Sequence, residues 1–155
     1  MEQKTKINAA DATQDLLITR EFDLPVELLF KAHADPEIIT QWMGTKILKF
    51  ESKKHGSYEI ETSDPKGNVA FRANGVIHEF IANKKIIRTF EMEGAPFGVQ
   101  LEMYEFEKLT DDTSKLTMHV IYESVAQRDQ VLKLPFAYGL NMAHNRIQEI
   151  LSKLK

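Results

Sequence analysis

Cysteine is absent from the 155 residues, which excludes disulfides, thiol nucleophiles, Fe–S clusters and thiolate zinc sites together. A strong excess of one charge is also missing, because 20 Lys and Arg stand against 23 Asp and Glu. The resulting net charge of −3 gives no electrostatic footprint for nucleic acid or an anionic membrane. No apolar run approaches the roughly 20 residues of a membrane span, and the polar N-terminus lacks the apolar stretch of a signal peptide. We therefore expect a cytoplasmic protein that binds neither nucleic acid nor membrane.

Short metal-binding and catalytic motifs are missing as well. No HxxxH or HExxH pair occurs among the five histidines, which are His33, His55, His78, His119 and His144. There is no G-x-S-x-G turn for a nucleophilic serine, and the glycines are isolated rather than grouped in a phosphate-binding loop. We therefore expect no metal and no cofactor, so any chemistry would depend on Tyr, His, Arg or carboxylate side chains.

Length and composition are those of one globular domain. Domains typically run to roughly 100–200 residues, and the chain is 43% hydrophobic and 28% charged, which is typical of a folded protein. Residues 1–13 carry few apolar anchors, so we expect a flexible N-terminal arm followed by a single domain over residues 14–155. We expect a monomer or a weak homodimer.

The spacing of apolar residues predicts an α+β fold. A first strand over 15–23 leads into two short helices, which begin near Pro25 and Asp35 and end near Gly44. Period-two segments then predict six further strands, over 46–53, 57–63, 69–80, 84–93, 98–109 and 113–124. The connections are short, so these strands are expected to pair antiparallel with their sequence neighbours. Helical spacing returns after Ser124, with a kink or break expected near Pro135 and Gly139.

Several short motifs follow one another along the chain in a fixed order. They are Pro25, Phe30, Ala32, Asp35-Pro36 and Trp42; Gly56 and Tyr58; Gly75, Ile77, Glu79, Phe80 and Lys85-Ile86-Ile87; Ala126, Arg128, Asp129, Gly139 and Asn145–Leu151. In this order the chain resembles the START-like (SRPBCC, helix-grip) superfamily, and within it the branch named for the activator of the heat-shock-protein-90 ATPase. The resemblance implies a curved seven-stranded antiparallel sheet wrapped around a long C-terminal helix, with an internal cavity between them. One departure is Met43, where many relatives carry a second aromatic residue beside the tryptophan.

Arg88 is the most informative single residue. It shares one strand face with Ile86, Phe90 and Met92, so one charge lies on an otherwise apolar face. If that face is covered, the guanidinium needs either a carboxylate such as Glu102 or an anionic group of a ligand. Both alternatives stay open on the sequence.

Other side chains are candidates for the wall of the expected cavity. Trp42 would close one end, and Tyr104, His119 and Tyr122 could offer hydrogen bonds inside an apolar pocket. Flexible apolar lining near the kink would come from Met43, Phe136, Tyr138 and Met142. Ordinary core packing is the alternative for each of them, and the alternation does not decide which strand faces point inward. The candidate site is therefore Trp42, Met43, Arg88, Phe90, Tyr104, His119, Tyr122, Phe136, Tyr138 and Met142.

Three kinds of function are compatible with these features. A small-molecule binding protein would hold an apolar or amphipathic ligand in the cavity without a cofactor. A co-chaperone or other interaction module is implied only by the name of the resembled branch. An enzyme acting on an aromatic or polyketide-type substrate would need a Tyr, His or Glu as general acid or base. The sequence favours binding over catalysis.

Overall fold

The computed structural model describes residues 4–155 and is an α+β fold. Its strands are β1 (Lys6–Asn8), β2 (Asp15–Phe22), β3 (Lys46–Phe50), β4 (Ser57–Ser63), β5 (Val69–Ile81), β6 (Lys85–Met92), β7 (Val99–Lys108) and β8 (Ser114–Ile121). Its helices are α1 (Val26–Ala34), α2 (Pro36–Met43), α3 (Val125–Leu132) and α4 (Phe136–Ser152). None of these helices, within residues 4–155, is both long and apolar enough to cross a membrane.

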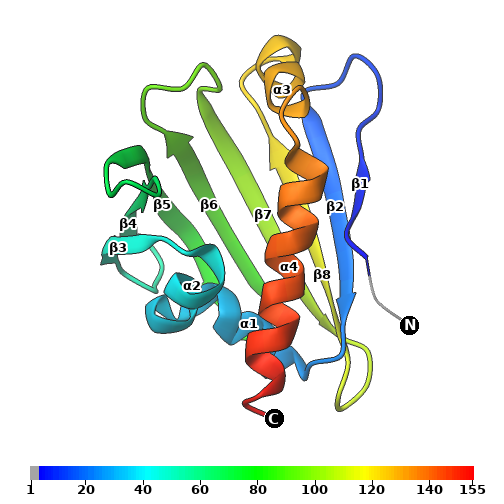
Figure 1. The fold of residues 1–155 in the computed structure, drawn as a ribbon. Coiled ribbons are helices and arrows are strands. Elements are labelled where there is room, and N and C mark those ends of the chain that lie inside the picture. Colours follow the sequence, from blue (N-terminus) through cyan, green and yellow to red (C-terminus); the bar gives the residue numbers. More distant parts are fainter. Residues whose placement is uncertain (1–3) are drawn as a thin grey trace.

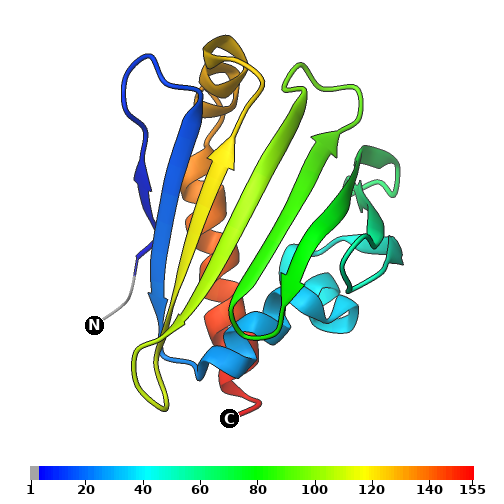
Figure 2. The ribbon, with the colours of Figure 1, turned by 180° about the vertical axis from the view of Figure 1, so that it is seen from behind.

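The strands form one antiparallel sheet in the order β1-β2-β8-β7-β6-β5-β4-β3. Strands β3 to β8 pair with their sequence neighbours, as the short connections predict, and β2 pairs with β8. All four helices lie on one side of the sheet, where α4 runs across the strands and α1 and α2 cover one end (Figure 1). Seen from behind, the other side of the sheet carries no helix formed by residues 4–155 (Figure 2). The predicted helix-grip arrangement is confirmed.

The sheet has eight strands rather than seven, because part of the expected flexible arm forms β1. Residues Lys6 and Asn8 pair with Thr19 and Leu17 of β2. Further along, the carbonyl of Ala10 accepts a hydrogen bond of 2.6 Å from Nη1 of Arg128. Backbone pairing and distant polar partners therefore hold this segment, although it has few apolar anchors. Residues 1–3 of the expected arm lie outside the described part of the chain.

Local signals for the helix ends are confirmed. The Asp35 side chain accepts a hydrogen bond from the backbone N–H of Glu37 at the start of α2, and α2 ends at Gly44 in the left-handed conformation. Ser124 likewise caps α3 by accepting from Gln127. The chain breaks before Phe136, as Pro135 predicts, whereas Gly139 lies inside α4 without interrupting it.

Burial identifies the inner face of each strand. On β8 the buried residues are Leu116, Met118 and Val120, and the residues between them are only half-buried. The strand registers pair Val120 of β8 with Glu102 of β7, and Glu102 with Arg88 of β6, so these three residues share the inner face. Tyr104 is two residues after Glu102 on β7, is also buried, and therefore lies on the same face. The side chains of Arg88 and Tyr104 therefore point toward the helices.

Candidate functional site

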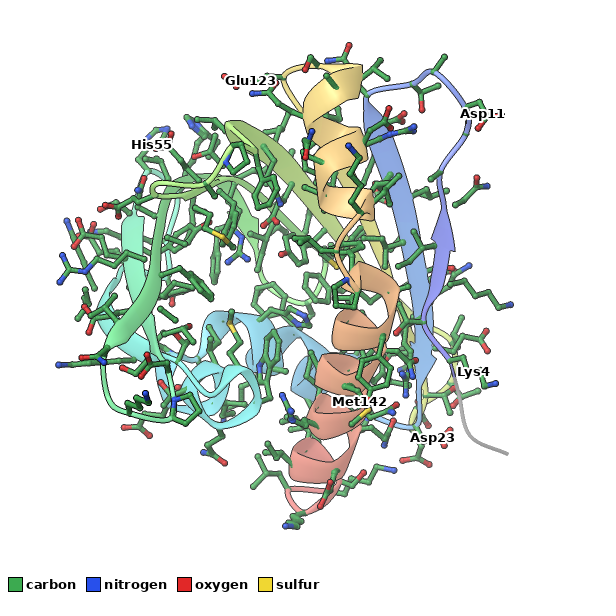
Figure 3. All side chains as sticks on the ribbon, turned by 45° about the horizontal axis from the view of Figure 1, so that its top comes forward. Lys4, Asp11, Asp23, His55, Glu123 and Met142 are labelled. Atoms are coloured by element: carbon green, nitrogen blue, oxygen red, sulfur yellow. The ribbon has the colours of Figure 1, made fainter. Side chains whose placement is uncertain are left out.

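The helices cover the inner face of the sheet unevenly. Every inner residue of β8 is buried beneath α4. Along β6, by contrast, Ile86 is buried while Arg88, Phe90 and Met92 are only partly buried. The apolar surface is thus incompletely covered on the β6 side of the molecule. Figure 3 shows side chains filling much of the space between α4 and strands β3–β5.

A network of polar side chains lies on this less covered side. We call it the Arg88 cluster; its members are Tyr58, Arg88, Gln100, Glu102 and Tyr104. Nε of Arg88 donates to Oε1 of Glu102 at 2.8 Å, and Nη2 donates to the hydroxyl of Tyr104 at 2.8 Å. That hydroxyl donates to Glu102 at 2.9 Å, and the amide of Gln100 donates to the other carboxylate oxygen at 2.7 Å. The Arg88–Glu102 pair that the sequence left open is therefore formed.

Two aromatic rings hold the guanidinium in place. Cζ of Arg88 lies 4.8 Å from the ring centroid of Tyr58 and 5.0 Å from that of Tyr104. The Tyr58 hydroxyl reaches across Gly75 and donates to the carbonyl of Thr89. A Cβ atom at Gly75 would lie 2.0 Å from that carbonyl and 2.5 Å from the Tyr58 hydroxyl. Glycine at position 75 is therefore a requirement for this arrangement.

Burial and charge fix the protonation states in the cluster. Burial raises the pKa of Tyr104 and of Tyr58, so both hydroxyls remain protonated and can donate. Burial also opposes the charge on Arg88, but Tyr104, Tyr58 and Glu102 together hold the pKa of Arg88 above its usual value. The cluster consequently combines a permanent cation, its carboxylate partner and two hydroxyl groups.

His33 of α1 lies beside the cluster. Its ring centroid is 5.6 Å from those of Tyr104 and Trp42, and it is 7% exposed. Its Nδ1 is 3.0 Å from the carbonyl of Leu29, which can only accept, so Nδ1 carries the proton. Burial lowers the pKa of His33 to about 4, so the ring is neutral at pH 7.

Several of the predicted site residues lie in or beside this region. Arg88 and Tyr104 belong to the cluster itself, and Trp42 donates its indole N–H to the carbonyl of Ala32 at 2.7 Å. Tyr122 is buried on the inner side of the sheet. The remaining predicted residues that pack, partly buried, against the core are Met43, Phe90 and Phe136.

The other three predicted residues lie on the outer face of the sheet or are exposed on α4. His119 lies on the outer face, where its Nε2 is 2.7 Å from Asp15 Oδ2 of the neighbouring strand β2. The prediction for His119 is corrected because only the alternate residues of β8 point inward. Tyr138 is 71% exposed on α4, and Met142, labelled in Figure 3, is 37% exposed on the same helix.

The histidines are dispersed over the structure. His55 lies in the turn before β4, remote from α4 (Figure 3), while His33 and His144 are buried in α1 and α4. Within residues 4–155, no three His, Asp or Glu side chains converge to hold a metal ion. Polar groups that a bound molecule could meet on the inner face include those of the Arg88 cluster, His33 and the Tyr122 hydroxyl.

Four residues of the Arg88 cluster and its surroundings were not among the predicted site residues: His33, Tyr58, Gln100 and Glu102. A signal existed for His33, because it continues the helical apolar stripe of Val26, Leu29 and Phe30. Glu102 was named only as a partner for Arg88. Nothing in the pattern singles out Gln100, which joins the network through its position two residues before Glu102 on β7.

The chain matches one protein-family model. Residues 23–152 match the family described as activator of Hsp90 ATPase homolog 1-like protein. The match covers both helical regions and strands β3 to β8. A comparison with curated proteins finds no significant match.

Solved bacterial structures share the fold. A protein from Rhodobacter sphaeroides has 21% identity and a TM-score of 0.86, with 97% of this chain and 99% of that chain covered. Protein Ms6760 from Mycobacterium smegmatis has 20% identity and a TM-score of 0.82, with 94% and 95% covered. Protein NE0264 from Nitrosomonas europaea has 22% identity and a TM-score of 0.78, with 96% and 100% covered. At these identities the similarity concerns the fold.

Proposed function

The chain belongs to the activator of Hsp90 ATPase homolog 1-like family, and on that premise we propose that it binds a small apolar or amphipathic molecule. The ligand lies between the inner face of the sheet and helices α1, α2 and α4. Its apolar part contacts Phe90, Phe136 and Met43, and its polar end meets the Arg88 cluster.

The observation that carries this proposal is the incomplete burial of Arg88. Its side chain keeps 16% of its exposure although two aromatic rings and a carboxylate surround it. A charged group in such a position is a hydrogen-bond donor that an entering molecule can reach. The neighbouring partly buried aromatic and methionine side chains supply the apolar contact surface.

Native mass spectrometry of freshly purified protein tests the proposal directly, followed by thermal unfolding with a panel of fatty acids, sterols and aromatic metabolites. We expect a co-purified small molecule and a melting temperature that rises with ligand concentration. Phe90→Glu should remove the shift, because it introduces a charge on the inner face. Ile87→Glu, on the opposite face of the same strand, is the matched control and should retain the shift. A folded protein with no adduct and no shift would contradict the proposal.

An interaction module is the second candidate, supported by a separate observation. Leu134, Tyr138 and Met142 are spaced four residues apart and are 50%, 71% and 37% exposed. Tyr138 and Met142 lie on α4 and Leu134 just precedes it, and exposed apolar side chains of this kind are suited to contact with another protein. The test is the ATPase rate of purified Hsp90 with the wild-type chain and with Tyr138→Ser. Stimulation that the substitution weakens supports this candidate, and an unchanged ATPase rate with the wild-type chain excludes it.

A further inference from the structure

We infer that the Arg88 cluster and His33 select a neutral head group that both accepts and donates a hydrogen bond, such as a carboxamide, over a carboxylate. The inference rests on the proposed binding function and specifies the chemical class of its ligand. Three features of the site carry it: a free donor, a charge that is already neutralised, and a free acceptor.

The donor is Nη1 of Arg88. Nε and Nη2 of the same guanidinium are occupied by Glu102 and Tyr104. Within residues 4–155, Nη1 makes no hydrogen bond, and it is not sealed from solvent. This N–H group can therefore meet a carbonyl oxygen of a ligand without breaking an existing contact.

The charge of Arg88 is already balanced inside the protein. Glu102 is 5% exposed and accepts hydrogen bonds from Arg88, Tyr104 and Gln100. An anionic head group that reached Arg88 would lie close to this carboxylate and would lose most of the benefit of the cation. A cationic head group would meet Arg88 itself. A neutral polar group avoids both repulsions.

The acceptor is Nε2 of His33. Because Nδ1 carries the proton that binds the carbonyl of Leu29, Nε2 carries a lone pair. No residue in the described part of the chain donates to this atom, and it is not sealed from solvent either. His33 and Arg88 both lie against the ring of Tyr104, at 5.6 Å and 5.0 Å from its centroid. A donor and an acceptor thus lie near the same ring, and Arg88 is close enough to act electrostatically on His33.

The test compares three probes of one shape by calorimetry at pH 7.5. They are naphthalene-2-carboxamide, which accepts and donates; 2-acetylnaphthalene, which only accepts; and naphthalene-2-carboxylate, an anion. We expect the carboxamide to bind about tenfold more tightly than the carboxylate, with the ketone between them. A carboxylate that binds as tightly as the carboxamide overturns the inference and leaves the proposed function standing. If none of the three probes binds, and native mass spectrometry shows no adduct, both fail together.

Two substitutions test separately whether the Glu102 charge and the His33 acceptor cause the preference for the carboxamide. Glu102→Gln removes the compensating charge and should raise carboxylate affinity about tenfold. The matched control is Glu105→Gln, on the exposed outer face of the same strand, which should change nothing. His33→Phe should abolish the advantage of the carboxamide over the ketone. An unchanged carboxylate affinity in folded Glu102→Gln overturns the charge argument, and an unchanged amide advantage in His33→Phe overturns the acceptor. The wild-type ratio decides the inference even if a variant does not fold.

Discussion

Two arginines point inward from the same sheet, and their surroundings differ. Arg20 of β2 donates to Thr5 at 3.4 Å and to Asn141 at 3.2 Å, and it is 3% exposed. We call Thr5, Arg20, Asn141 and His144 the Arg20 cluster. Its partners come from the N-terminal segment and from α4, whereas the hydrogen-bonding partners of Arg88 lie on the sheet itself. Both guanidiniums also contact aromatic rings.

The contrast separates a structural role from a recognition role. The Arg20 cluster joins the N-terminal segment, β2 and α4, and its buried members Arg20 and His144 are hydrogen-bonded within the fold. The hydrogen bonds of Arg88 join the neighbouring strands β6 and β7, which already pair through their backbones, and one donor remains available. A buried arginine is thus a candidate for ligand contact when the fold does not depend on it and does not fully cover it.

The largest expected effect comes from Gly75, which supports the Arg88 cluster. Gly75→Ala should lower the free energy of unfolding by about 4 kcal/mol, because the new Cβ meets the backbone carbonyl of Thr89 and displaces Tyr58. Gly139→Ala, in the helix that covers the Arg20 cluster, is the matched control. It meets no atom within 4 Å and should raise stability by roughly 0.5–1 kcal/mol. Urea denaturation measures both changes, and equal effects of the two substitutions would contradict this account.

Much of the fold could be predicted from local patterns. Turn residues and period-two segments located strands β3 to β8, and the Asp35, Ser124 and Pro135 signals located helix ends. The short strand β1 could not be predicted in this way. It is three residues long, and the neighbouring Thr5 binds Asn141, 136 residues away in sequence. Contacts of that range leave no local pattern.

The second effect concerns the Arg20 cluster. Arg20→Leu should lower the free energy of unfolding by about 3 kcal/mol, because Thr5 and Asn141 lose the buried donor that links the N-terminal segment to α4. Ligand affinity, measured on the folded fraction, should remain unchanged. A decrease in the free energy of unfolding of less than about 1 kcal/mol would contradict a structural role for the Arg20 cluster. A large change in ligand affinity would contradict its separation from ligand recognition.

The site itself was only partly predictable. Arg88 stood out because one charge shared a face with apolar residues, and its pairing with Glu102 was one of two stated alternatives. Which faces point inward remained undecided, and β5 shows the reason. Its register shifts between Ile77 and Glu79, so Ile77 and Phe80 both contribute to the inner side although they are three residues apart. A bulge of this kind interrupts the alternation on which such an assignment depends.

The third effect tests how far the fold depends on Arg88. Arg88→Met leaves Glu102 buried without its cation and should lower the free energy of unfolding by about 2 kcal/mol. The double variant Arg88→Met/Glu102→Leu should return to within about 1 kcal/mol of the wild type, because an apolar pair can replace a partly buried ion pair. Both variants should lose affinity for the carboxamide probe. A double variant less stable than either single variant would show that the pair is needed for folding.

The smallest effect compares the two buried histidines, one beside each cluster. Burial lowers the pKa of His33 to about 4 and that of His144 to about 3, below the ordinary value of 6.5. Between pH 6.5 and pH 4 the unfolded chain binds protons that the folded chain does not, so stability falls as the pH falls. Each histidine should contribute about 1.4 kcal/mol per pH unit over this window.

His33→Phe keeps a ring among Trp42, Tyr104 and Phe106, and should reduce the pH slope of stability by about half. His144→Phe should reduce the slope equally, but it also removes the hydrogen bond with Thr5 and should therefore lower stability at pH 7.5 as well. Urea midpoints from pH 4 to 7.5 measure both quantities. His33→Phe also removes a hydrogen bond, the one from Nδ1 to the carbonyl of Leu29, so the pH slope rather than the stability at pH 7.5 identifies the role of His33. A slope that His33→Phe leaves unchanged would contradict the buried, neutral ring whose Nε2 is available to a ligand.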